Sequence, residues 1–459
     1  MTDTRSLLAE AVGAEHVLTN GDVPPDYGHD EALSIAPGRP EFVVRPGDTA
    51  QVAAVLRIAG ERGLRVTARG SGTGLSGAAI PGPGGLVVSF ERMNRVLEID
   101  AANSVAVVQP GVTLAALDAA AAGHGLVYPV FPGEMGASLG GTIATNAGGM
   151  RAVKYGVTRQ HVLGLEAVLA SGEVLRTGGK YVKNASGYDL TQLIVGSEGT
   201  LALVTEAVVR LYPRLNYQAT VLAPFGSLDQ VTAAVPGIVG SGIGPLILEY
   251  VDTVTMAAIT AAQDIDLGVP AAIRDKTLAY LVVMVEERTE ERLAVVEAEL
   301  AELLAELGAG DVYVLPDPAA RRLIEARERA FWAAKNAGAD DIVDTVLPRA
   351  AMAGFLAEVG ELVGSGGGGG LVMGAGHAGD GNVHLAVFQP DAAARSALMR
   401  GIFAAAVARG GAVSGEHGIG TAKKRYFLEL ADPVAVGLMR RIKQDFDPGG
   451  ILAPGVLFE

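Results

Sequence analysis

The stretch RVTARGSGTGLSGAAIPGPGG, residues 65–85, contains the pattern G-x-G-x-x-G that opens many dinucleotide-binding turns. Val66 and Ala68 alternate with polar residues and predict a strand before this pattern. A helix after it is excluded, because Pro81 and Pro83 follow among glycines and proline disrupts helix interiors. A glycine-rich loop can still bind an anion through successive backbone N–H groups. The stretch therefore predicts a phosphate-binding loop outside a Rossmann fold, which also argues against a nicotinamide cofactor.

The composition indicates a globular chain of two to three domains, at roughly 150 residues each for a length of 459. With 49% hydrophobic residues the chain can bury a large core, and its 62 glycines indicate many tight turns. The net charge of −15 argues against nucleic acid or an anionic membrane surface as a general partner. The absence of cysteine excludes disulfides, thiolate metal sites and a catalytic thiol.

Neither the first residues nor the apolar runs predict a targeting or membrane segment. The start, MTDTRSLLAEAVG, carries Asp3 and Glu10 and lacks the apolar stretch of a signal peptide. The longest strongly apolar run, LAYLVVMV at 278–285, is far shorter than the roughly 18 residues of a membrane span. We expect a cytoplasmic protein without an integral membrane segment, and a peripheral association with a membrane stays open.

The rhythm of apolar segments changes near residue 213. Before it, we expect helices over 49–63 and over 113–125, the latter capped by Thr113, a hairpin over 161–178, two short strands over 201–213, and strands over 42–46, 64–69, 85–90, 95–100 and 104–110. After it, we expect antiparallel strands over 217–225, 245–252 and 277–287, backed by helices over 228–240, 289–307 and 317–338. The glycine run 365–370 is expected to be a flexible connector within this region. The apolar, turn-rich end, 445–459, is expected to pack back on the first domain. We therefore divide the chain into residues 1–215, 216–440 and 441–459.

Two stretches carry candidate metal ligands. In GAGHAGDGNVHLAVF, His377 and His384 flank an Asp-Gly pair that is typical of a hairpin turn, which would bring both imidazoles to one end of two strands. In VSGEHGIG, Glu416 and His417 are adjacent, and the surrounding glycines allow both to approach one site. Two histidines and one glutamate suit a divalent metal with an open position, which would leave His417 free for proton transfer. Spacing alone does not establish that the stretches meet, and a structural role for the histidines stays open.

A third stretch, IATNAGGMRAVKYGVTRQH at 143–161, follows the glycine-rich PGEMGASLGG at 132–141. Ordinary tight turns would account for either one. Two glycine-rich surfaces before residue 150, however, fit a long ligand that touches the backbone at several points, such as FAD, better than a single phosphate.

Taken together, the motifs resemble those of the FAD-dependent D-2-hydroxy-acid dehydrogenases, which include the glycolate oxidase flavoprotein subunit, D-lactate dehydrogenase and D-2-hydroxyglutarate dehydrogenase. The resemblance extends over nearly the whole chain and rests on the order of these strings: YGHDEA, PEFVVRPGDTAQV, RGSGTGLSGAAIP, GGTIATNAGGMRAVKYG, VGSEGTLALVTE, GHAGDGNVH, GEHGIG and DPGGILAPG. It implies an α+β fold: a two-subdomain vanillyl-alcohol oxidase-type FAD-binding domain over 1–215, an α+β substrate (cap) domain with an antiparallel sheet and the metal site over 216–440, and a C-terminal segment over 441–459 that returns to the FAD domain.

The resemblance also implies which residues bind FAD. The pyrophosphate would be wrapped by Arg69, Gly70, Ser71, Gly72, Thr73, Gly74, Leu75 and Ser76. The flavin and its ribityl chain would be followed by Pro132, Gly133, Gly136, Ser138, Gly141, Thr142, Asn146, Gly148 and Gly149. The adenosine half would lie near Glu198, Gly199 and Val204. Relatives with covalent FAD often carry a histidine about where Thr73 stands, so we expect FAD to be bound non-covalently.

In the metal-containing branch of the family, the matching residues make His377, His384 and Glu416 the ligands of a divalent ion (Zn, Mn or Fe) and His417 the base. Lys335 lies where relatives often have an arginine that binds the substrate carboxylate, and Arg349 matches an arginine frequent in the glycolate oxidase-like branch. Both could equally be exposed surface cations. Ala453 replaces an asparagine that is usual in the C-terminal motif. Ala386 stands where the 2-hydroxyglutarate enzymes carry asparagine, which weakens the case for a five-carbon diacid.

The expected function is therefore the oxidation of a small D-2-hydroxy acid such as D-lactate or glycolate to the 2-oxo acid. Electrons would leave the flavin for a non-NAD acceptor: a quinone, an electron-transfer flavoprotein or a partner subunit. A homodimer stays open. Two alternatives remain at this point: a metal-independent flavin oxidase of an alcohol or sugar on the same fold, and a non-catalytic flavin-binding subunit.

Overall fold

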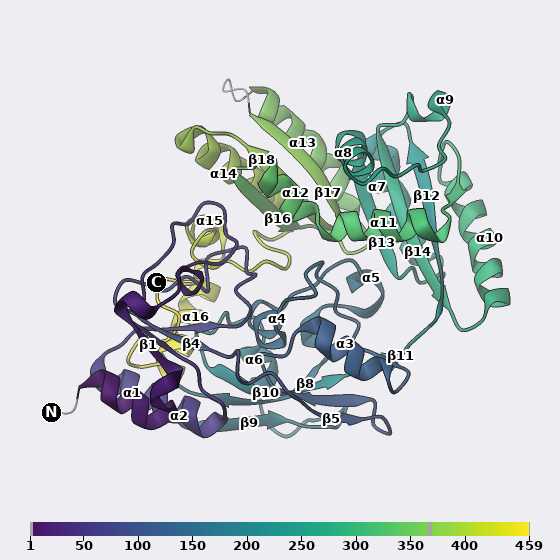
Figure 1. The fold of residues 1–459 in the computed structure, drawn as a ribbon. Helices are drawn as coiled ribbons and strands as arrows, with labels where there is room; N and C mark the ends of the chain where they lie inside the picture. Colours follow the sequence, from purple (N-terminus) through teal and green to yellow (C-terminus); the bar gives the residue numbers. More distant parts are fainter. Residues whose placement is uncertain (1–2, 366–369, 459) are drawn as a thin grey trace.

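The computed structural model describes residues 3–365 and 370–458, and it consists of two halves built on separate β-sheets (Figure 1). In the N-terminal half, described strands form a four-stranded sheet in the order β1-β2-β4-β3, with β2, β4 and β3 parallel. Its strands are β1 (Val17–Thr19), β2 (Phe42–Val44), β3 (Val66–Arg69) and β4 (Leu86–Ser89). Helices α1 (Thr4–Val12) and α2 (Thr49–Arg62) share a core with this sheet.

Helix α2 shows why the sequence specifies its boundaries. The Asp48 carboxylate accepts a hydrogen bond from the Gln51 amide at the first turn, and Gly63 ends the helix with a φ of +66°. Between them, Val52, Val55 and Leu56 recur at helical spacing and are fully buried. Strand β3 follows this helix, and the glycine-rich loop follows β3. In the described part of the chain, the next element after this loop is strand β4 rather than a helix.

A second sheet of the N-terminal half is antiparallel throughout, with five described strands in the order β5-β6-β10-β8-β9. The strands are β5 (Val96–Asp100), β6 (Val105–Val108), β8 (Val162–Val168), β9 (Val174–Gly178) and β10 (Leu203–Arg210). Helices α3 (Leu114–Ala122), α4 (Leu139–Thr145), α5 (Ala152–Tyr155) and α6 (Leu190–Ile194) lie between these strands in the sequence, and β7 (Leu126–Val127) pairs with β11 (Tyr212–Pro213). The hairpin expected over 161–178 is β8–β9, and the Thr113 hydroxyl caps α3 as predicted.

The C-terminal half contains an antiparallel sheet with the described strand order β15-β12-β14-β13-β17-β18-β16. Its strands are β12 (Tyr217–Phe225), β13 (Ile247–Asp252), β14 (Ala279–Glu287), β15 (Tyr313–Val314), β16 (Asp341–Val346), β17 (Leu371–His377) and β18 (Asn382–Phe388). One face packs against α7 (Leu228–Gly240), α10 (Glu290–Glu306), α13 (Met352–Ser365) and α14 (Ala392–Ala408). The other face packs against α8 (Thr253–Gln263) and α11 (Asp317–Glu328), while α9 (Ala271–Arg274) lies before β14.

The helix expected over 317–338 is two helices rather than one. Helix α11 ends at Glu328, Arg329 takes φ −90° and ψ 10°, and α12 (Ala330–Asn336) continues in a new direction. The apolar side of α11 packs on the sheet, whereas Phe331 and Trp332 of α12 line a pocket at its edge. The expected connector over 365–370 falls mostly on residues 366–369, which lie outside the described residues.

After α14 the chain returns toward the N-terminal half. Helix α15 (Lys424–Leu430) packs against α14, where the ring centroids of Phe403 and Tyr426 lie 5.1 Å apart, and helix α16 (Pro433–Phe446), drawn in yellow in Figure 1, lies beside the N-terminal sheet. Leu452 forms a parallel bridge with Val66 of β3, and the buried Lys443 ammonium donates to the carbonyls of Thr200 (3.0 Å) and Leu452 (2.9 Å). Residues 414–423, which precede these helices, therefore pass between the two halves. Across residues 3–365 and 370–458, no helix is both long and apolar enough for a membrane crossing.

Candidate functional site

The hairpin β17–β18 places two histidines beside each other. Ala375 of β17 pairs with His384 of β18, and His377 follows at the end of β17, so the two imidazole centroids lie 4.9 Å apart. The turn between the strands requires Gly381, whose φ is +83°, since a Cβ there would lie 2.0 Å from the Leu347 carbonyl oxygen. The Asp-Gly pair that predicted this hairpin thus sets the separation of the two rings.

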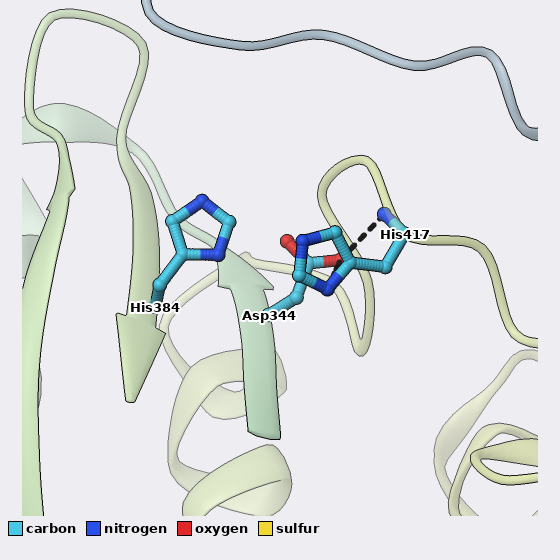
Figure 2. A group of neighbouring side chains, drawn as sticks. All are labelled: Asp344, His384 and His417. Atoms are coloured by element: carbon cyan, nitrogen blue, oxygen red, sulfur yellow. Dashed lines mark hydrogen bonds and ion pairs between the residues drawn. The ribbon is translucent and has the colours of Figure 1, made fainter. Parts of the chain in front are cut away.

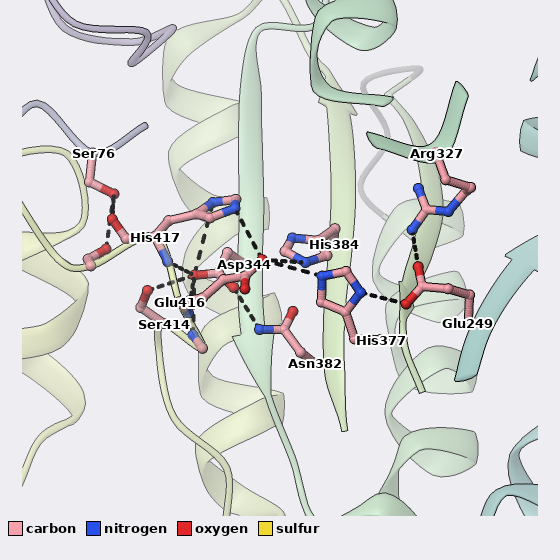
Figure 3. A network of polar contacts seen from close by, with 12 residues as sticks. Ser76, Glu249, Arg327, Asp344, His377, Asn382, His384, Ser414, Glu416 and His417 are labelled. Carbon is pink, nitrogen blue, oxygen red and sulfur yellow. Dashed lines mark hydrogen bonds and ion pairs between the residues drawn. The ribbon is translucent and has the colours of Figure 1, made fainter. Parts of the chain in front are cut away.

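The loop that carries Glu416 and His417 is folded around the carboxylate of Asp344 in β16 (Figure 3). One carboxylate oxygen, Oδ2, accepts from the Ser414 hydroxyl at 2.6 Å and from three successive backbone amides, those of Gly415, Glu416 and His417, at 2.9–3.1 Å. The other oxygen accepts from the side-chain amide of Asn382 at 3.0 Å. Burial alone would raise the pKa of Asp344, but its electrostatic interactions with His417 and Lys423 hold it well below its ordinary value. Asp344 therefore fixes the loop as an ionised anchor.

This anchored loop directs the Glu416 carboxylate between the two histidines. Its Oε1 lies 3.3 Å from His377 Nε2 and 3.2 Å from His384 Nε2. His384 Nε2 is buried and, apart from this contact with Glu416, has no polar partner that forms a well-aligned hydrogen bond among the described residues, which is costly unless another group binds it. The ligand atoms of His377, His384 and Glu416 lie within 4.8 Å of one another. Two imidazole nitrogens and a carboxylate at this separation fit a divalent cation.

Glu249 of β13 is the outer partner of this group, and sequence reasoning did not find it. Its Oε1 lies 2.5 Å from His377 Nδ1, so the Nε2 of His377 is the nitrogen presented to Glu416. Its Oε2 accepts from the guanidinium of Arg327 at 2.5 Å. Burial would lower the pKa of His377, but the charges of Glu249 and Glu416 raise it well above the usual value. A histidine fixed by a carboxylate is the arrangement that orients metal-binding imidazoles.

A second grouping, Asp344 with His384 and His417, also satisfies the distances for a cation (Figure 2). Both oxygens of Asp344 already accept the hydrogen bonds described above. Occupying them with a cation would release the loop that holds Glu416 and His417. The chemistry of the donors therefore favours the His377–His384–Glu416 group.

His417 lies next to this group without belonging to it. Its ring stacks on that of His384 with centroids 5.0 Å apart, and its Nε2 is 3.9 Å from Glu416 Oε1. Burial lowers the pKa of His417 to about 4, although the charge of Asp344 opposes this. Its Nδ1 has no hydrogen-bond partner within the described part of the chain. The imidazole is therefore neutral near pH 7 and able to accept a proton.

A pocket of about 310 Å³ lies between the two halves, and it is lined by the side chains of His377, His384, Glu416 and His417. Thr73 and Leu75 of the first glycine-rich loop, with Pro132 and Gly133, line its opposite wall. Arg327 of α11 also lines it, although its side chain is only 4% exposed. Sequence reasoning missed Arg327, but a signal existed: it follows Ala320 and Leu323 at helical spacing on the buried face of α11, where an arginine is unusual.

The two cations that the sequence predicted for the substrate lie elsewhere. The Lys335 ammonium pairs with Glu31 Oε2 at 2.5 Å and lies 5.1 Å from the centre of the Trp332 ring. The exposed Arg349 donates from Nε to the Gly379 carbonyl, behind the hairpin turn. Neither is among the pocket-lining residues. Their role in substrate binding stays a prediction that the geometry does not support.

The residues predicted to bind FAD occupy several different positions, and Thr73, Leu75, Pro132 and Gly133 of that set line the first pocket. Gly70, Gly141, Gly199 and Val204 line a second, narrow pocket of about 70 Å³. A Cβ at Gly70 would lie 1.9 Å from the Ser138 hydroxyl, whose oxygen also accepts from the amides of Ser71 (3.4 Å) and Gly141 (3.3 Å). Backbone from three segments can thus approach a ligand closely here, which fits the extended FAD expected from the sequence.

Other members of that set support the fold around these pockets. Arg69 donates to the His29 carbonyl at 2.6 Å, and Asn146, with a φ of +55°, accepts from the Arg159 amide. Gly149 (φ +114°) packs against the Phe131 carbonyl, and Gly148 against Glu416. Four more make short local contacts. Gly72 packs on Arg69, and the Gly74 carbonyl accepts a hydrogen bond from the Glu31 amide. The Gly136 amide donates to the Glu134 carboxylate, and the Thr142 hydroxyl donates to the Leu139 carbonyl.

Ser76 and Glu198 contact the Glu416–His417 loop rather than either pocket. The Ser76 hydroxyl lies within hydrogen-bond distance of the carbonyls of His417 (3.0 Å) and Gly418 (2.9 Å). The Glu198 carboxylate accepts from the amides of Ile419 (2.9 Å) and Gly420 (2.8 Å), and burial raises its pKa to about 7. The N-terminal half thus holds the loop of the candidate metal group directly.

The fold and the two glycine-lined surfaces define a flavoprotein of the vanillyl-alcohol oxidase type, and comparisons with known proteins agree. Residues 40–178 match the FAD binding domain family, and residues 214–457 match the C-terminal domain of FAD linked oxidases. Two solved structures show the fold: 4-ethylphenol oxidase from Gulosibacter chungangensis (TM-score 0.79, 19% identity, 99% of this chain and 96% of that one) and p-cresol methylhydroxylase (TM-score 0.78, 17% identity, 98% and 95%).

Similar sequences extend over the full chain. An uncharacterized FAD-linked oxidoreductase of Mycobacterium tuberculosis is 57% identical over 100% of this chain and 99% of its own. A D-lactate dehydrogenase of Archaeoglobus fulgidus is 38% identical (94% and 96%), and the glycolate oxidase subunit GlcD of Bacillus subtilis is 36% identical (99% and 97%). The chain therefore belongs to the FAD-linked oxidase family and is an FAD-linked oxidoreductase, which confirms the expected flavin and fold.

Replacing Asp344 by asparagine is expected to destabilise the protein by about 3–5 kcal/mol, because it leaves the buried Lys423 ammonium, 3.6 Å away, without its countercharge. An amide would also place N–H groups against the loop amides. The free energy of unfolding from urea titration measures this loss. The exposed Asp229→Asn change is the control, with an expected shift within about 0.5 kcal/mol. Equal stability of both variants would contradict the anchoring role of Asp344.

Proposed function

We propose that this oxidoreductase is a metal-assisted dehydrogenase that oxidises a D-2-hydroxy acid to the 2-oxo acid. The observation that carries the proposal is one pocket in which His377, His384 and Glu416 converge beside a neutral His417 and face the loop of Thr73 and Leu75. A flavin-binding module alone would not need a vacant base at this position. The names of relatives, D-lactate dehydrogenase, glycolate oxidase subunit and D-2-hydroxyglutarate dehydrogenase, support the same substrate class.

Groups bound here would supply part of the chemistry: FAD would take up the C2 hydrogen with its two electrons and pass the electrons to a non-NAD acceptor, and a divalent ion held by His377, His384 and Glu416 would act as a Lewis acid on the substrate oxygens. The chain supplies the rest. His417, neutral because burial holds its pKa at about 4, takes the proton of the 2-hydroxyl group. The Asp344 anchor keeps that imidazole beside the pocket through the His417 amide, 2.9 Å from the carboxylate.

Arg327 is the residue that we assign to the substrate carboxylate. Its side chain is buried, it lines the pocket, and its Nε has no hydrogen-bond partner among the described residues. Its bond to Glu249 fixes the guanidinium next to His377. A carboxylate bound there would place the neighbouring C2 hydroxyl near His377 and His417, which is where the proton must be removed.

Anaerobic mixing of the FAD-loaded protein with the two enantiomers of lactate tests the proposal. The flavin absorbance in the visible region is expected to bleach with D-lactate and to persist with L-lactate. A panel of other D- and L-2-hydroxy acids extends the test beyond one substrate. If none of the D-acids bleaches the flavin whereas a simple alcohol or phenol does, the metal-independent alcohol oxidase is the better assignment.

Replacing Arg327 by lysine is expected to lower kcat/KM for a D-2-hydroxy acid by about 10- to 100-fold, the scale of one hydrogen bond to a charged group. Lysine keeps the charge that Glu249 requires, so the fold is retained. Steady-state kinetics and the affinity for the 2-oxo acid product measure the loss. Arg329→Lys, on the exposed neighbour in the same pocket, is the matched control. Equal effects at both positions would show that Arg327 has no particular role in binding the substrate.

A further inference from the structure

We infer that the side chain of the substrate is apolar, so that the preferred substrates are D-2-hydroxy acids with an aliphatic chain longer than that of lactate. This inference rests on the proposed function, because it takes the hydroxyl and carboxylate to lie at His417 and Arg327. It adds the part of the pocket that receives the remainder of the molecule: a surface formed by Met373, Ala386 and Ile342, which we call the apolar row.

The register of the sheet places this apolar row directly beside the histidines. Ala375, His384 and Asp344 are paired across β17, β18 and β16. Two residues along the same strands, Met373, Ala386 and Ile342 are paired in the same way and face the same side. This displacement is about 6.8 Å along a strand. All three members of the apolar row line the pocket, so a chain that leaves C2 along the sheet meets them next.

A second apolar group of residues lines the same pocket. It consists of Ala258, Ile259 and Ala262 of α8, together with Phe331 and Ala334 of α12. Phe331 is held by an edge contact with Trp332, with ring centroids 5.3 Å apart. Beyond Ala386, the next residue on the same face of β18 is Phe388, which lines the pocket as well. An aliphatic chain would therefore exchange water for contacts with both groups of apolar residues.

A second carboxylate finds no comparable partner along this path. Among the described pocket-lining residues the arginines are Arg327, which we assign to the first carboxylate, and Arg329, which is exposed. Glu31, Glu134 and Glu328 line the pocket too. The nearby Lys335 is neutralised by Glu31. A carboxylate over Ala386 would lose its hydration without an ion pair, which is strongly unfavourable.

The test is a substrate series with the FAD-loaded protein: D-lactate, D-2-hydroxybutyrate, D-2-hydroxyvalerate, D-2-hydroxyhexanoate and D-2-hydroxyglutarate. Each added methylene is expected to raise kcat/KM about fourfold until the chain passes Phe388, the fold-change that corresponds to about 0.8 kcal/mol. The diacid is expected to fall below the five-carbon monoacid. The affinities of the matching 2-oxo acids, measured from the perturbation of the flavin absorbance, should follow the same order without turnover.

The outcomes separate this inference from the proposed function. If D-lactate reduces the flavin but chain length has no effect, or the diacid is preferred, the apolar assignment is wrong and the proposed function stands. If none of the D-2-hydroxy acids reduces the flavin and none of the 2-oxo acids binds, both fail together. A rising series for monoacids in both turnover and binding supports the assignment.

Two variants locate the effect in the apolar row. Ala386→Phe would fill the space beside His384 and is expected to flatten or invert the dependence on chain length, whereas Ala393→Phe, on an exposed position of α14 across the sheet, should keep it. Phe331→Ala, on α12 and outside the sheet, provides a second measurement if Ala386→Phe does not fold. It should reduce kcat/KM for the hexanoate more than for lactate. An unchanged slope in a folded Ala386→Phe or Phe331→Ala protein would overturn the inference.

Discussion

Replacing His417 by alanine is expected to slow the reduction of the flavin by a D-2-hydroxy acid by about 100- to 10,000-fold, the contribution typical of a positioned general base. The ring of His417 lines the pocket outside the His377–His384–Glu416 group, and its buried Nδ1 has no hydrogen-bond partner among the described residues. Its backbone, rather than its side chain, makes the 2.9 Å bond to Asp344. The alanine variant should therefore keep the loop fold and its bound FAD, and lose only the proton transfer.

Stopped-flow mixing under anaerobic conditions measures this rate directly, and the flavin spectrum before mixing shows that FAD is still bound. His124→Ala, at an exposed histidine after α3, is the control and should react at the normal rate. A His417→Ala protein that reduces its flavin as fast as the wild type would exclude this residue as the base.

The same assignment fixes the pH dependence of the wild-type rate. The neutral form of His417 is the active base, and burial lowers its pKa to about 4. The rate attributable to this group should therefore be constant above about pH 5 and fall only as the pH drops through about 4. An ordinary histidine would give a midpoint near 6.5.

The ligands of the candidate metal group could be predicted from the sequence because their spacing depends on local structure. A Gly-rich turn between two strands brings His377 and His384 together, and a Gly-flanked Glu-His pair supplies the third group. The outer residues could not be found in this way. Asp344 and Glu249 lie on other strands, and only the sheet order β13-β17-β18-β16 brings them to the hairpin. Both are acidic residues within apolar strands, which marks them as unusual in the sequence. Which residues they contact can be known only once the register of the strands is known.

Some residues of the clearest family motifs make different contacts in the structure from those that the resemblance implies. Ser76 and Glu198 belong to strings that the resemblance connects with FAD, yet their polar atoms bind the loop of His417 and Gly420. Similarly, Lys335 and Arg349 match cations of relatives by position, whereas the buried Arg327 lines the pocket. Sequence position predicts which segments contribute to a site, but which side chain of a segment faces a pocket depends on packing between the two halves, and that is a tertiary property.

Removing divalent cations with EDTA is expected to abolish the reduction of the flavin by D-2-hydroxy acids, and adding back Zn, Mn or Fe is expected to restore it. His384→Ala and Glu416→Ala should bind less than a stoichiometric amount of metal and lose more than about 100-fold in rate, since even outer partners of metal ligands contribute about 10- to 100-fold. Metal content by mass spectrometry gives a readout that does not depend on turnover.

The affinity for the ion should also depend on pH in a defined direction. Glu249 and Glu416 raise the pKa of His377 well above 6.5, so without an ion this imidazole carries a proton at neutral pH. A cation must displace that proton from Nε2, so binding releases a proton and weakens as the pH falls. Calorimetry in buffers of different ionisation enthalpy measures the proton release, and His124→Ala serves again as the control. A metal-free protein that reduces its flavin at the full rate would show that the two histidines and Glu416 serve the fold rather than the reaction, and would favour a metal-independent flavin oxidase.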